Sequence, residues 1–299
     1  MEIYPFIDLT EGQTKELYDF IISFGSNAYF DSCEEMVRNY YGPIFNKGAT
    51  YFSIWDGNSI KGTIGIITKE VEEKEEVIIT SINVLEQEKN VFKILLEKGI
   101  EESIKVNPKK IKIGIHSNKE YLRPFIEELE FKGIYRAVIL GLKSYDILHS
   151  VKMKRNITFS SISEENKIHF KEVHNKGFLY SPNGAILTDE QIDEMLQEND
   201  DKHNLVKICY LNNEPVGIHE SMLKEKIGWI EAIAISPKWQ GKGFGKLLLK
   251  EAVSNLHQCG AEEIKLVVIS SNERAYKFYL KYGFEVEKIT SHWFEKRIE

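Results

Sequence analysis

The sequence predicts a chain of two α/β domains in tandem. Its 299 residues exceed the usual domain length of roughly 100–200 residues, and 42% of them are hydrophobic, which is enough for two cores. A motif of the first half also returns in the second. The segment HSNKEYLRPFIEELEFKG aligns with SSNERAYKFYLKYGFEV, so that Asn118 lies over Asn272 and Phe131 over Phe284. The offsets of 154 and 153 residues are nearly constant, which is typical of an internal duplication.

The elements of the first half follow from local patterns. The Asp-Gly-Asn turn at 56–58 is a strong hairpin signal and joins predicted strands at 51–55 and 60–68. The charged run 69–76 comes next, and we interpret its glutamates as solvated surface at a hairpin tip, not as a metal site. A strand at 77–85 follows. The remaining predicted elements are a helix from Val91, a strand at 111–115, a helix from Asn118 and a strand at 131–142.

The second half is predicted to repeat this order. Helices are expected from Ser163 and from Thr188, and a hairpin is expected about Asn212 and Asn213. A buried strand at 264–269 then precedes a helix that Asn272 caps and Gly283 closes. The linker is expected near 144–156, so the two domains are predicted to span 1–148 and 155–299.

The stretch 229–250 combines a strand, a glycine loop and a helix. The strand at 230–235 ends at a Ser-Pro pair, and apolar residues recur with helical spacing after the loop. Glycines at the start of a helix let backbone N–H groups approach a ligand, and the helix dipole favours an anion there. The stretch therefore predicts a ligand that carries phosphate. Glycines occupy every second position of the loop, at Gly241, Gly243 and Gly245.

Two commoner phosphate loops do not fit this spacing. The Rossmann pattern GxGxxG needs its third glycine where Lys246 stands. The P-loop needs its first glycine at Gln240 and a magnesium-binding hydroxyl at Leu247. Instead, Gln240, Gly243 and Gly245 follow the order Q/R-x-x-G-x-G/A. This order resembles the acetyl-CoA loop of the GNAT superfamily of N-acetyltransferases.

A second motif extends the resemblance. The string SNERAYKFYLKYGFE looks like the family's second signature, with an asparagine, an alanine, an aromatic pair and then Gly-Phe. The specific part of the resemblance covers 229–284. It implies an α/β (α+β) fold of two tandem GNAT-like copies, each a mixed, mostly antiparallel twisted sheet flanked by helices. It also implies an acetyl-CoA-dependent N-acetyltransferase, in which a primary amine of a small molecule or peptide attacks the thioester directly. A non-catalytic acyl-CoA sensor or interaction module is the alternative.

The resemblance assigns residues to acetyl-CoA as the co-substrate. The pantetheine arm would lie beside Ile233, Ala234 and Ile235 like an added strand, and a backbone N–H near Ala234 would meet the oxyanion. Asn272 would hold this arm, cap its helix, or do both. The loop lysines would add charge or are ordinary helix surface. The pyrophosphate would bind the main chain of the glycine loop, which comprises Gln240, Gly241, Lys242, Gly243, Phe244, Gly245 and Lys246.

Acetyl transfer to an amine also needs a proton acceptor and a proton donor. Glu231 is the candidate base or substrate contact, and the alternative is a solvated strand glutamate. Tyr279 is the candidate that donates to or hydrogen-bonds the leaving sulfur, because a tyrosine pKa of about 10 lies somewhat above a thiol's. Its alternative is a packed core tyrosine. Acceptor contacts are expected from the loop 177–184 with Tyr180, from the following helix and from Glu220.

The first half lacks this chemistry. When Ile82, Asn83 and Val84 are aligned with the strand end 233–235, the bulky residues 89–94 lie over the glycine loop. Phe125 or Ile126 replaces Tyr279, and the choice depends on the position of a one-residue gap. We therefore interpret the first half as a degenerate copy that buttresses the active one or shapes its acceptor cleft.

Composition excludes several classes of function. The net charge of −7 argues against a general grip on a nucleic-acid backbone and mildly favours a cationic acceptor. Three widely spaced cysteines without a C-x-x-C motif suit a reducing compartment. His169 and His174 fit no metal-ligand pattern, so no metal is expected. No signal peptide or long apolar stretch is seen, so a cytoplasmic protein without a membrane partner is expected, as a monomer or homodimer.

Overall fold

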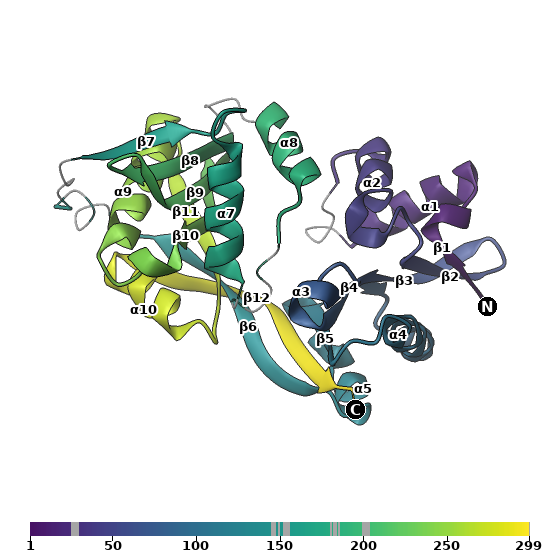
Figure 1. Ribbon diagram of the computed structural model, residues 1–299. Coiled ribbons are helices and arrows are strands. Elements are labelled where there is room, and N and C mark those ends of the chain that lie inside the picture. Colours follow the sequence, from purple (N-terminus) through teal and green to yellow (C-terminus); the bar gives the residue numbers. More distant parts are fainter. Residues whose placement is uncertain are drawn as a thin grey trace. The chain divides into compact units, whose positions relative to one another are not determined.

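The computed structural model describes residues 1–24, 30–144, 148, 150–151, 156–179, 181, 184, 186–198 and 204–298. The chain divides into two compact units. Unit 1 comprises Met1–Arg136 and Thr290–Glu299, and unit 2 comprises Ala137–Ile289. Figure 1 draws their helices and strands in colours that follow the sequence.

Unit 1 contains a sheet with helices on both faces. Its elements are β1 (Glu2–Pro5), η1 (Phe6–Asp8), α1 (Glu11–Ile22), α2 (Cys33–Tyr40), η3 (Pro43–Phe45), β2 (Tyr51–Asp56), β3 (Ser59–Ile67), α3 (Val71–Lys74), β4 (Glu76–Val84), α4 (Lys89–Ile104), β5 (Lys110–His116), η4 (Ser117–Leu122), α5 (Arg123–Glu128) and the start of β6 (Lys132–Leu142). One core cluster packs β2 to β5 against α4 and α5, and an aromatic cluster packs α1 and α2 against Tyr51 of β2. Strands β1 to β5 pair antiparallel with their neighbours, except that β4 and β5 are parallel.

Unit 2 repeats this arrangement. Its elements are β7 (Ile157–Ser161), α7 (Lys167–Phe178), α8 (Asp189–Glu198), β8 (Asn204–Leu211), β9 (Glu214–Lys224), β10 (Ile227–Ile235), η5 (Pro237–Trp239), α9 (Phe244–Gln258), β11 (Glu263–Ile269), α10 (Glu273–Lys281) and the start of β12 (Phe284–Arg297). Strands β7 to β10 are antiparallel, and β10 and β11 are parallel. One core cluster lies under α9 and α10, and another lies under α7 and α8.

Two strands contribute residues to both units. Ala137 to Gly141 of β6 pair antiparallel with β11 inside unit 2, although they follow the elements of the first half. Ser291 to Arg297 of β12 pair antiparallel with β5 inside unit 1. The last strand of each half therefore completes the sheet of the other half. The predicted domain boundaries at 148 and 155 fall in a segment that lies largely outside the described residues.

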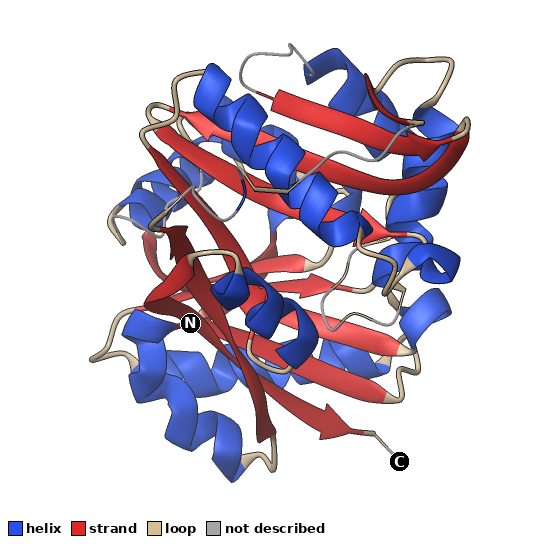
Figure 2. Cartoon of the chain, turned by 90° about the vertical axis from the view of Figure 1, so that its left-hand side faces the viewer, coloured by secondary structure: helices blue, strands red, loops and turns tan. Residues whose placement is uncertain are grey.

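The predicted fold class is confirmed. Both units are mixed, mostly antiparallel sheets flanked by helices, and Figure 2 shows the helices in blue against the strands in red. The repeated element order is the one that the aligned motif predicted. Local signals explain where helices begin: Thr10 and Gln13 form a reciprocal capping box at α1, as Thr188 and Gln191 do at α8.

The interpretation of the charged run 69–76 as solvated surface is wrong for two of its residues. Glu70 is 4% exposed and Glu76 is 2% exposed. Glu76 forms ion pairs with Lys112 at 2.8 Å and Lys110 at 3.0 Å, and these pairs lower the pKa of its carboxyl although burial alone would raise it. The opposite charges for Glu76 come from β5, which is distant in sequence, whereas Glu70 pairs with Lys74 of the same run at 3.3 Å.

The gapless alignment of the two strand-to-helix connections is also wrong. It places residues 89–94 over the glycine loop, but these residues form the start of α4. The connection from β4 to α4 is Leu85 to Glu88, whereas the connection from β10 to α9 runs from Ser236 to Gly243. The connection of unit 1 is therefore half as long as that of unit 2, and it contains no glycine.

Candidate functional site

Strands β10 and β11 separate midway along their length. They pair in parallel from Ile227 to Ile230, opposite Glu263 to Leu266, and no pairing between them continues beyond Ile230 in this fully described stretch. Strand β11 pairs with β6 along its other edge, from Lys265 to Ile269. In the hairpin of β9 and β10 the register shifts between Ile230 and Ala232, which places Glu231 in a β-bulge. Among the described residues, no strand pairs with this edge of β10 beyond Ile230.

The backbone direction along this edge follows from one hydrogen bond. Ser236 donates its N–H to a carbonyl of β9 at 3.0 Å, so its backbone groups face β9. Backbone groups alternate in direction along a strand, so Ala234 also faces β9 and Ile233 and Ile235 face the opening. The predicted oxyanion donor near Ala234 is therefore better matched by the N–H of Ile233 or Ile235. The Ile235 carbonyl accepts a hydrogen bond from Nε2 of Gln240 at 3.2 Å.

The glycine loop links this edge to helix α9. Gly241 has φ +75° and Gly243 has φ +87°, a backbone region that favours glycine. Gly243 is the N-cap of α9 and offers no side chain to cap the first turn, where α-helices leave N–H groups without helical partners. A Cβ added at Gly245 would lie 3.4 Å from Cδ1 of Ile235, which is an ordinary contact. Backbone conformation therefore explains two of the three glycines.

Cationic side chains gather at the loop. Nζ of Lys242 lies 4.5 Å from the ring centroid of Trp239, and Nζ of Lys238 lies 5.6 Å from it. Lys238 and the Trp239 indole both bond to Glu214, and these bonds lower the pKa of the Glu214 carboxyl. Arg274 of α10 donates to the side chain of the loop glutamine at 3.2 Å. Positive charge beside a helix N-terminus suits a phosphate group.

Helix α10 carries two of the predicted residues. Asn272 accepts a hydrogen bond from the Ala275 N–H at 3.1 Å, so its predicted capping role is confirmed and its contact with pantetheine stays a prediction. Tyr279 is half-buried, with its ring 5.4 Å from that of Phe278 and 5.7 Å from that of Phe284. Within the described chain its hydroxyl makes no hydrogen bond. Burial raises the pKa of Tyr279 to about 12, so the hydroxyl stays protonated.

A pair of glutamates lies at the bulge. Glu220 of β9 is registered opposite Ala232, the residue that follows Glu231. Burial, together with the negative charge of Glu231, raises the pKa of Glu220 to about 7. Burial also raises the pKa of Glu231, although its side chain remains accessible to solvent. Among the described residues, no lysine, arginine or histidine forms an ion pair with either carboxyl, so both are available to an incoming cation.

The end of α7 packs on the face of β10 that carries the side chain of Ala234. A Cβ added at Gly177 would lie 2.8 Å from Cβ of Ala234, so this glycine permits the close approach of helix to strand. Asn175 holds the segment that leads into α8, because its side chain donates to the Leu187 carbonyl at 3.1 Å and accepts from the Leu187 N–H at 2.9 Å. The predicted acceptor residue Tyr180 lies outside the described residues.

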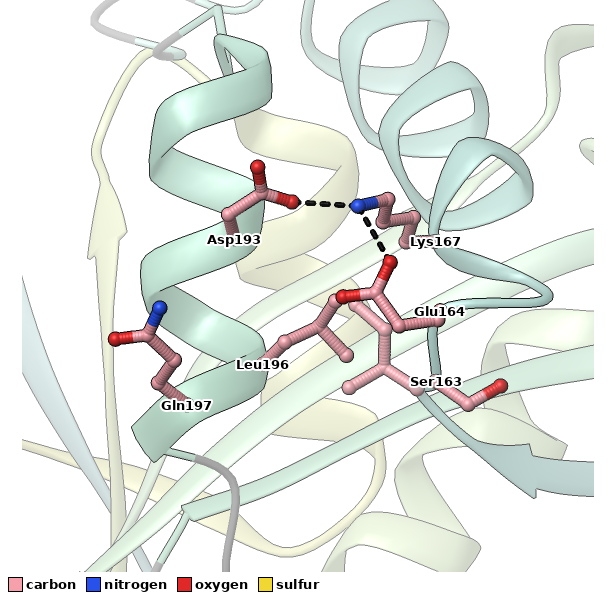
Figure 3. A pocket seen from close by; sticks show the side chains of 7 residues that line it. Ser163, Glu164, Lys167, Asp193, Leu196 and Gln197 are labelled. Atoms are coloured by element: carbon pink, nitrogen blue, oxygen red, sulfur yellow. Dashed lines mark hydrogen bonds and ion pairs between the residues drawn. The ribbon is translucent and has the colours of Figure 1, made fainter.

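An open pocket of about 520 Å³ lies elsewhere in unit 2, between α8 and the start of α7. In Figure 3, Lys167 lies between Asp193 and Glu164, and its Nζ is 2.7 Å from an oxygen of each. Three of its lining residues belong to α8, the helix from which acceptor contacts were expected, but neither glutamate of the bulge nor any residue of the glycine loop lines it. Its lining residues are Ile162, Ser163, Glu164, Lys167, Asp193, Leu196 and Gln197.

The structure joins the predicted residues into two groups. The loop, the end of β10 and the start of α10 are connected through Gln240, which bonds to both Ile235 and Arg274. Glu231 is coupled to Glu220, which the sequence suggested only as an acceptor contact. The sequence did contain a signal for this pair. A tight turn at 225–226 would place Glu231 directly opposite Glu220, and the bulge shifts this pairing by one residue.

The described residues contain no cluster of metal ligands and no membrane-spanning helix. No group of three or more histidine, cysteine, aspartate or glutamate side chains there could hold a metal ion. No helix of this part of the chain is long and apolar enough to cross a membrane.

Comparison with protein families matches residues 170–284 to the acetyltransferase (GNAT) family. Mycothiol acetyltransferase of Propionibacterium freudenreichii is 23% identical over 143 residues, which are 46% of this chain and 46% of the relative. The [ribosomal protein bS18]-alanine N-acetyltransferase of Haemophilus influenzae is 36% identical over 87 residues, or 28% of this chain and 58% of the relative. The chain thus spans about half the length of these curated relatives.

Comparison with solved structures shows the fold over the whole chain. A tandem GNAT protein from the clavulanic acid biosynthesis pathway superposes with a TM-score of 0.69 at 10% identity, covering 99% of this chain and 98% of that one. A GCN5-related N-acetyltransferase from Sphaerobacter thermophilus gives a TM-score of 0.66 at 15% identity, covering 96% and 91%. The two repeated units therefore have the architecture of tandem GNAT proteins.

Proposed function

We propose, from the premise that residues 170–284 form a domain of the acetyltransferase (GNAT) family, that this protein transfers the acetyl group of acetyl-CoA to a primary amine of a small molecule or peptide. The amine nitrogen attacks the thioester carbon, a carboxylate takes the amine proton, and the C–S bond breaks to leave a thiolate that takes a proton. The proposal is carried by the pair Glu220 and Glu231, which has no counter-ion among the described residues and lies on the strands that lead to the open edge of β10 and to the glycine loop.

The acetyl-CoA site would extend along three elements. The pantetheine arm would pair with the backbone of Ile233 and Ile235, because these residues face the opening beside β11. Its pyrophosphate would sit at the N-terminus of α9, where Gly241 and Gly243 bring the main chain close and the loop cations add charge. Asn272 would cap α10 beside the arm. The cofactor is a co-substrate here and leaves as CoA.

The proton acceptor would be Glu220, and Glu231 would hold the amine. An alkylamine is mostly protonated at neutral pH, as a lysine side chain is with a pKa of about 10.4. A general base works best when its pKa lies near the working pH, and the pKa of Glu220 is raised to about 7. Burial is the larger cause of this raised pKa, and the negative charge of Glu231 adds to it. The pair attracts an ammonium group and then accepts its proton.

Departure of the thiolate would be assisted by Tyr279. Its pKa of about 12 lies well above the ~8.5 of an ordinary thiol, so the hydroxyl would donate a hydrogen bond to the sulfur rather than lose its proton outright. The backbone N–H of Ile233 would stabilise the oxyanion, since it faces the opening.

The pH profiles of two matched variants test the proposal. The base must be deprotonated, so kcat/KM of the wild type should rise as pH increases through about 7. Glu220→Gln should lower kcat/KM by roughly 10²–10⁴-fold and remove this limb. Glu231→Gln should move the limb to lower pH, because it removes the negative charge that raises the pKa of Glu220, and should raise KM for the amine.

Glu225→Gln, in the turn of the same hairpin, is the control and should behave as the wild type. Thiol release from acetyl-CoA, measured with alkylamines and with N-terminal alanyl peptides as acceptors, reports turnover. If acetyl-CoA binds but no amine causes thiol release, the protein is an acyl-CoA-binding module. If a pH limb near 7 persists in Glu220→Gln, the base is another group.

A further inference from the structure

Unit 1 contains the same strand opening as unit 2. Strands β4 and β5 pair in parallel over four residues, Glu76 to Ile79 opposite Lys110 to Ile113, and no pairing between them continues beyond Ile79 in this fully described stretch. The register with β3 is interrupted near Ser81, whose φ is +50°. Strands β10 and β11 also pair over four residues before they separate at a bulge. Counted from the last pair, Ile82 and Val84 are therefore equivalent to Ile233 and Ile235.

The opening of unit 1 is filled by side chains from its own η4 segment. Nζ of Lys119 donates to the Ile82 carbonyl at 2.5 Å and to Oδ1 of Asn83 at 2.8 Å. The Tyr121 hydroxyl donates to the Val84 carbonyl at 2.8 Å. Lys119 is only 2% exposed, and no carboxylate forms an ion pair with it within the described chain. Its Nζ also lies 4.8 Å from the ring centroid of Phe24. A buried ammonium without a carboxylate partner is costly unless it satisfies groups that would otherwise lack partners.

We infer that Lys119 and Tyr121 occupy in unit 1 the slot that unit 2 leaves for the pantetheine chain, so that unit 1 is a closed copy sealed by its own side chains. The aligned motif places Lys119 over Glu273 and Tyr121 over Ala275. Glu273 is exposed on α10 and paired with Lys277 at 2.7 Å, so unit 2 has no such occupant at this position. The inference uses the cofactor position of the proposed function but none of its chemistry.

The acceptor side of unit 1 is filled as well. Asn83 stands where unit 2 has Ala234, and its Nδ2 donates to Oγ1 of Thr63 at 3.1 Å. The chain of polar contacts continues to two stacked tyrosines, in which the Tyr40 hydroxyl donates to the Tyr51 hydroxyl at 3.0 Å. Both tyrosines are buried, and burial raises the pKa of Tyr51 to about 12. A polar network thus replaces the space in which an amine would have to lie.

The connection before α4 in unit 1 is negatively charged, whereas the glycine loop before α9 in unit 2 carries lysines. Its short connection to α4 carries Glu86 and Glu88, and Glu88 is the N-cap residue of that helix. Carboxylates at a helix N-terminus interact favourably with the helix dipole and repel an added phosphate. Strand slot, acceptor side and helix start are therefore all closed to acetyl-CoA in unit 1, each by residues of the unit itself.

Transfer of the tyrosine into unit 2 tests the equivalence of the two slots. Ala275→Tyr in the full chain should weaken acetyl-CoA binding at least tenfold by calorimetry, because its phenol would reach the backbone edge that pantetheine needs. Lys277→Tyr, which adds the same ring at an exposed position of the same helix, is the control and should bind as the wild type does. Unchanged binding by Ala275→Tyr would overturn the inference. Failure of the wild type to bind acetyl-CoA would instead contradict the proposed function.

Removal of the lysine tests unit 1 directly. In the full-length Lys119→Ala variant, pantetheine should give a saturable rise in Tm that exceeds its effect on the wild type, since unit 2 is identical in both. Lys105→Ala, at an exposed position of the same unit, is the control and should respond as the wild type does. Equal responses of the Lys119→Ala variant and the wild type would overturn the inference.

A measurement on the wild type covers the case in which Lys119→Ala does not fold. Acetic anhydride labelling followed by mass spectrometry should modify Lys119 at least tenfold more slowly than Lys105, whose side chain is 56% exposed. Labelling of the two lysines at equal rates would show that Lys119 does not fill a closed slot.

Discussion

In unit 1 the carbonyls of Ile82 and Val84 accept hydrogen bonds from Lys119 and Tyr121, whereas no η4-like segment among the described residues of unit 2 covers the equivalent edge. The connection from sheet to helix is four residues long in unit 1 and eight in unit 2. Its charge also differs, with two glutamates in the first and two lysines in the second. The sheets themselves agree in strand order, parallel pairing and position of the register shift. The two units thus differ in their connections and in a few side chains, not in the sheet.

The largest expected effect comes from blocking the loop of unit 2. Gly243→Trp should lower acetyl-CoA affinity by at least ~100-fold, or about 2.7 kcal/mol, because a bulky side chain at φ +87° both strains the N-cap and fills the phosphate site. Gly260→Trp is the control, since Gly260 also has positive φ at +95° and follows the other end of α9, with open space around it. Calorimetry that finds equal affinities for the two variants would contradict a site at the loop.

A smaller effect is expected from the hydroxyl of Tyr279. Tyr279→Phe should lower kcat by roughly 10- to 100-fold, because a hydrogen bond to a charged group contributes about 1.5–3 kcal/mol. Affinity for acetyl-CoA should stay unchanged, since the ring still packs against Phe278 and Phe284. Single-turnover kinetics would check the chemical step. An unchanged rate constant there would leave Tyr279 as a packed aromatic residue.

The buried lysine of unit 1 predicts a dependence of stability on pH. Burial lowers the pKa of Lys119 to about 8 from its ordinary 10.5, so the unfolded chain binds more protons than the folded chain between these values. Stability should therefore rise with pH from about 8 to about 10.5 by this contribution. Urea denaturation of the wild type and of Lys119→Met at several pH values would measure it. Parallel pH curves for the two proteins would contradict a lowered pKa at Lys119.

The smallest expected effect is that of the hydroxyl of Tyr121. Tyr121→Phe removes one hydrogen bond to a backbone carbonyl and should lower the free energy of unfolding by about 1 kcal/mol. Acetyl-CoA affinity and turnover in unit 2 should not change. Chemical denaturation and the thiol-release assay would measure these quantities, and a loss of turnover larger than the loss of stability would show that unit 1 acts on the reaction.

Sequence patterns predicted the parts of the site that depend on neighbouring residues. The glycines indicated a loop, and Gly241 and Gly243 do have positive φ values. Asn272 was predicted as a helix cap, and its partner, the Ala275 N–H, is only three residues away. Cross-strand features were not predicted, because the bulge at Glu231 and the raised pKa of Glu220 depend on strand register and burial. The exchange of β6 and β12 between units depends on pairing between distant segments, which local periodicity does not encode.

The residues that fill unit 1 were equally invisible to sequence patterns. Alignment placed Lys119 over Glu273, but a lysine in a 3-10 segment gives no local sign that it is buried. Its place depends on where β4 and β5 separate. The charged run 69–76 shows the same limit, because Glu76 is buried only through its pairing with lysines of β5.

We propose that the chain has one acetyl-CoA site, in unit 2. Isothermal titration calorimetry of acetyl-CoA into the whole chain measures the number of sites directly. We expect a stoichiometry near one for the wild type and the loss of affinity given above, at least ~100-fold, for Gly243→Trp. A stoichiometry near two, or binding that survives Gly243→Trp, would place a site in unit 1 and contradict the claim.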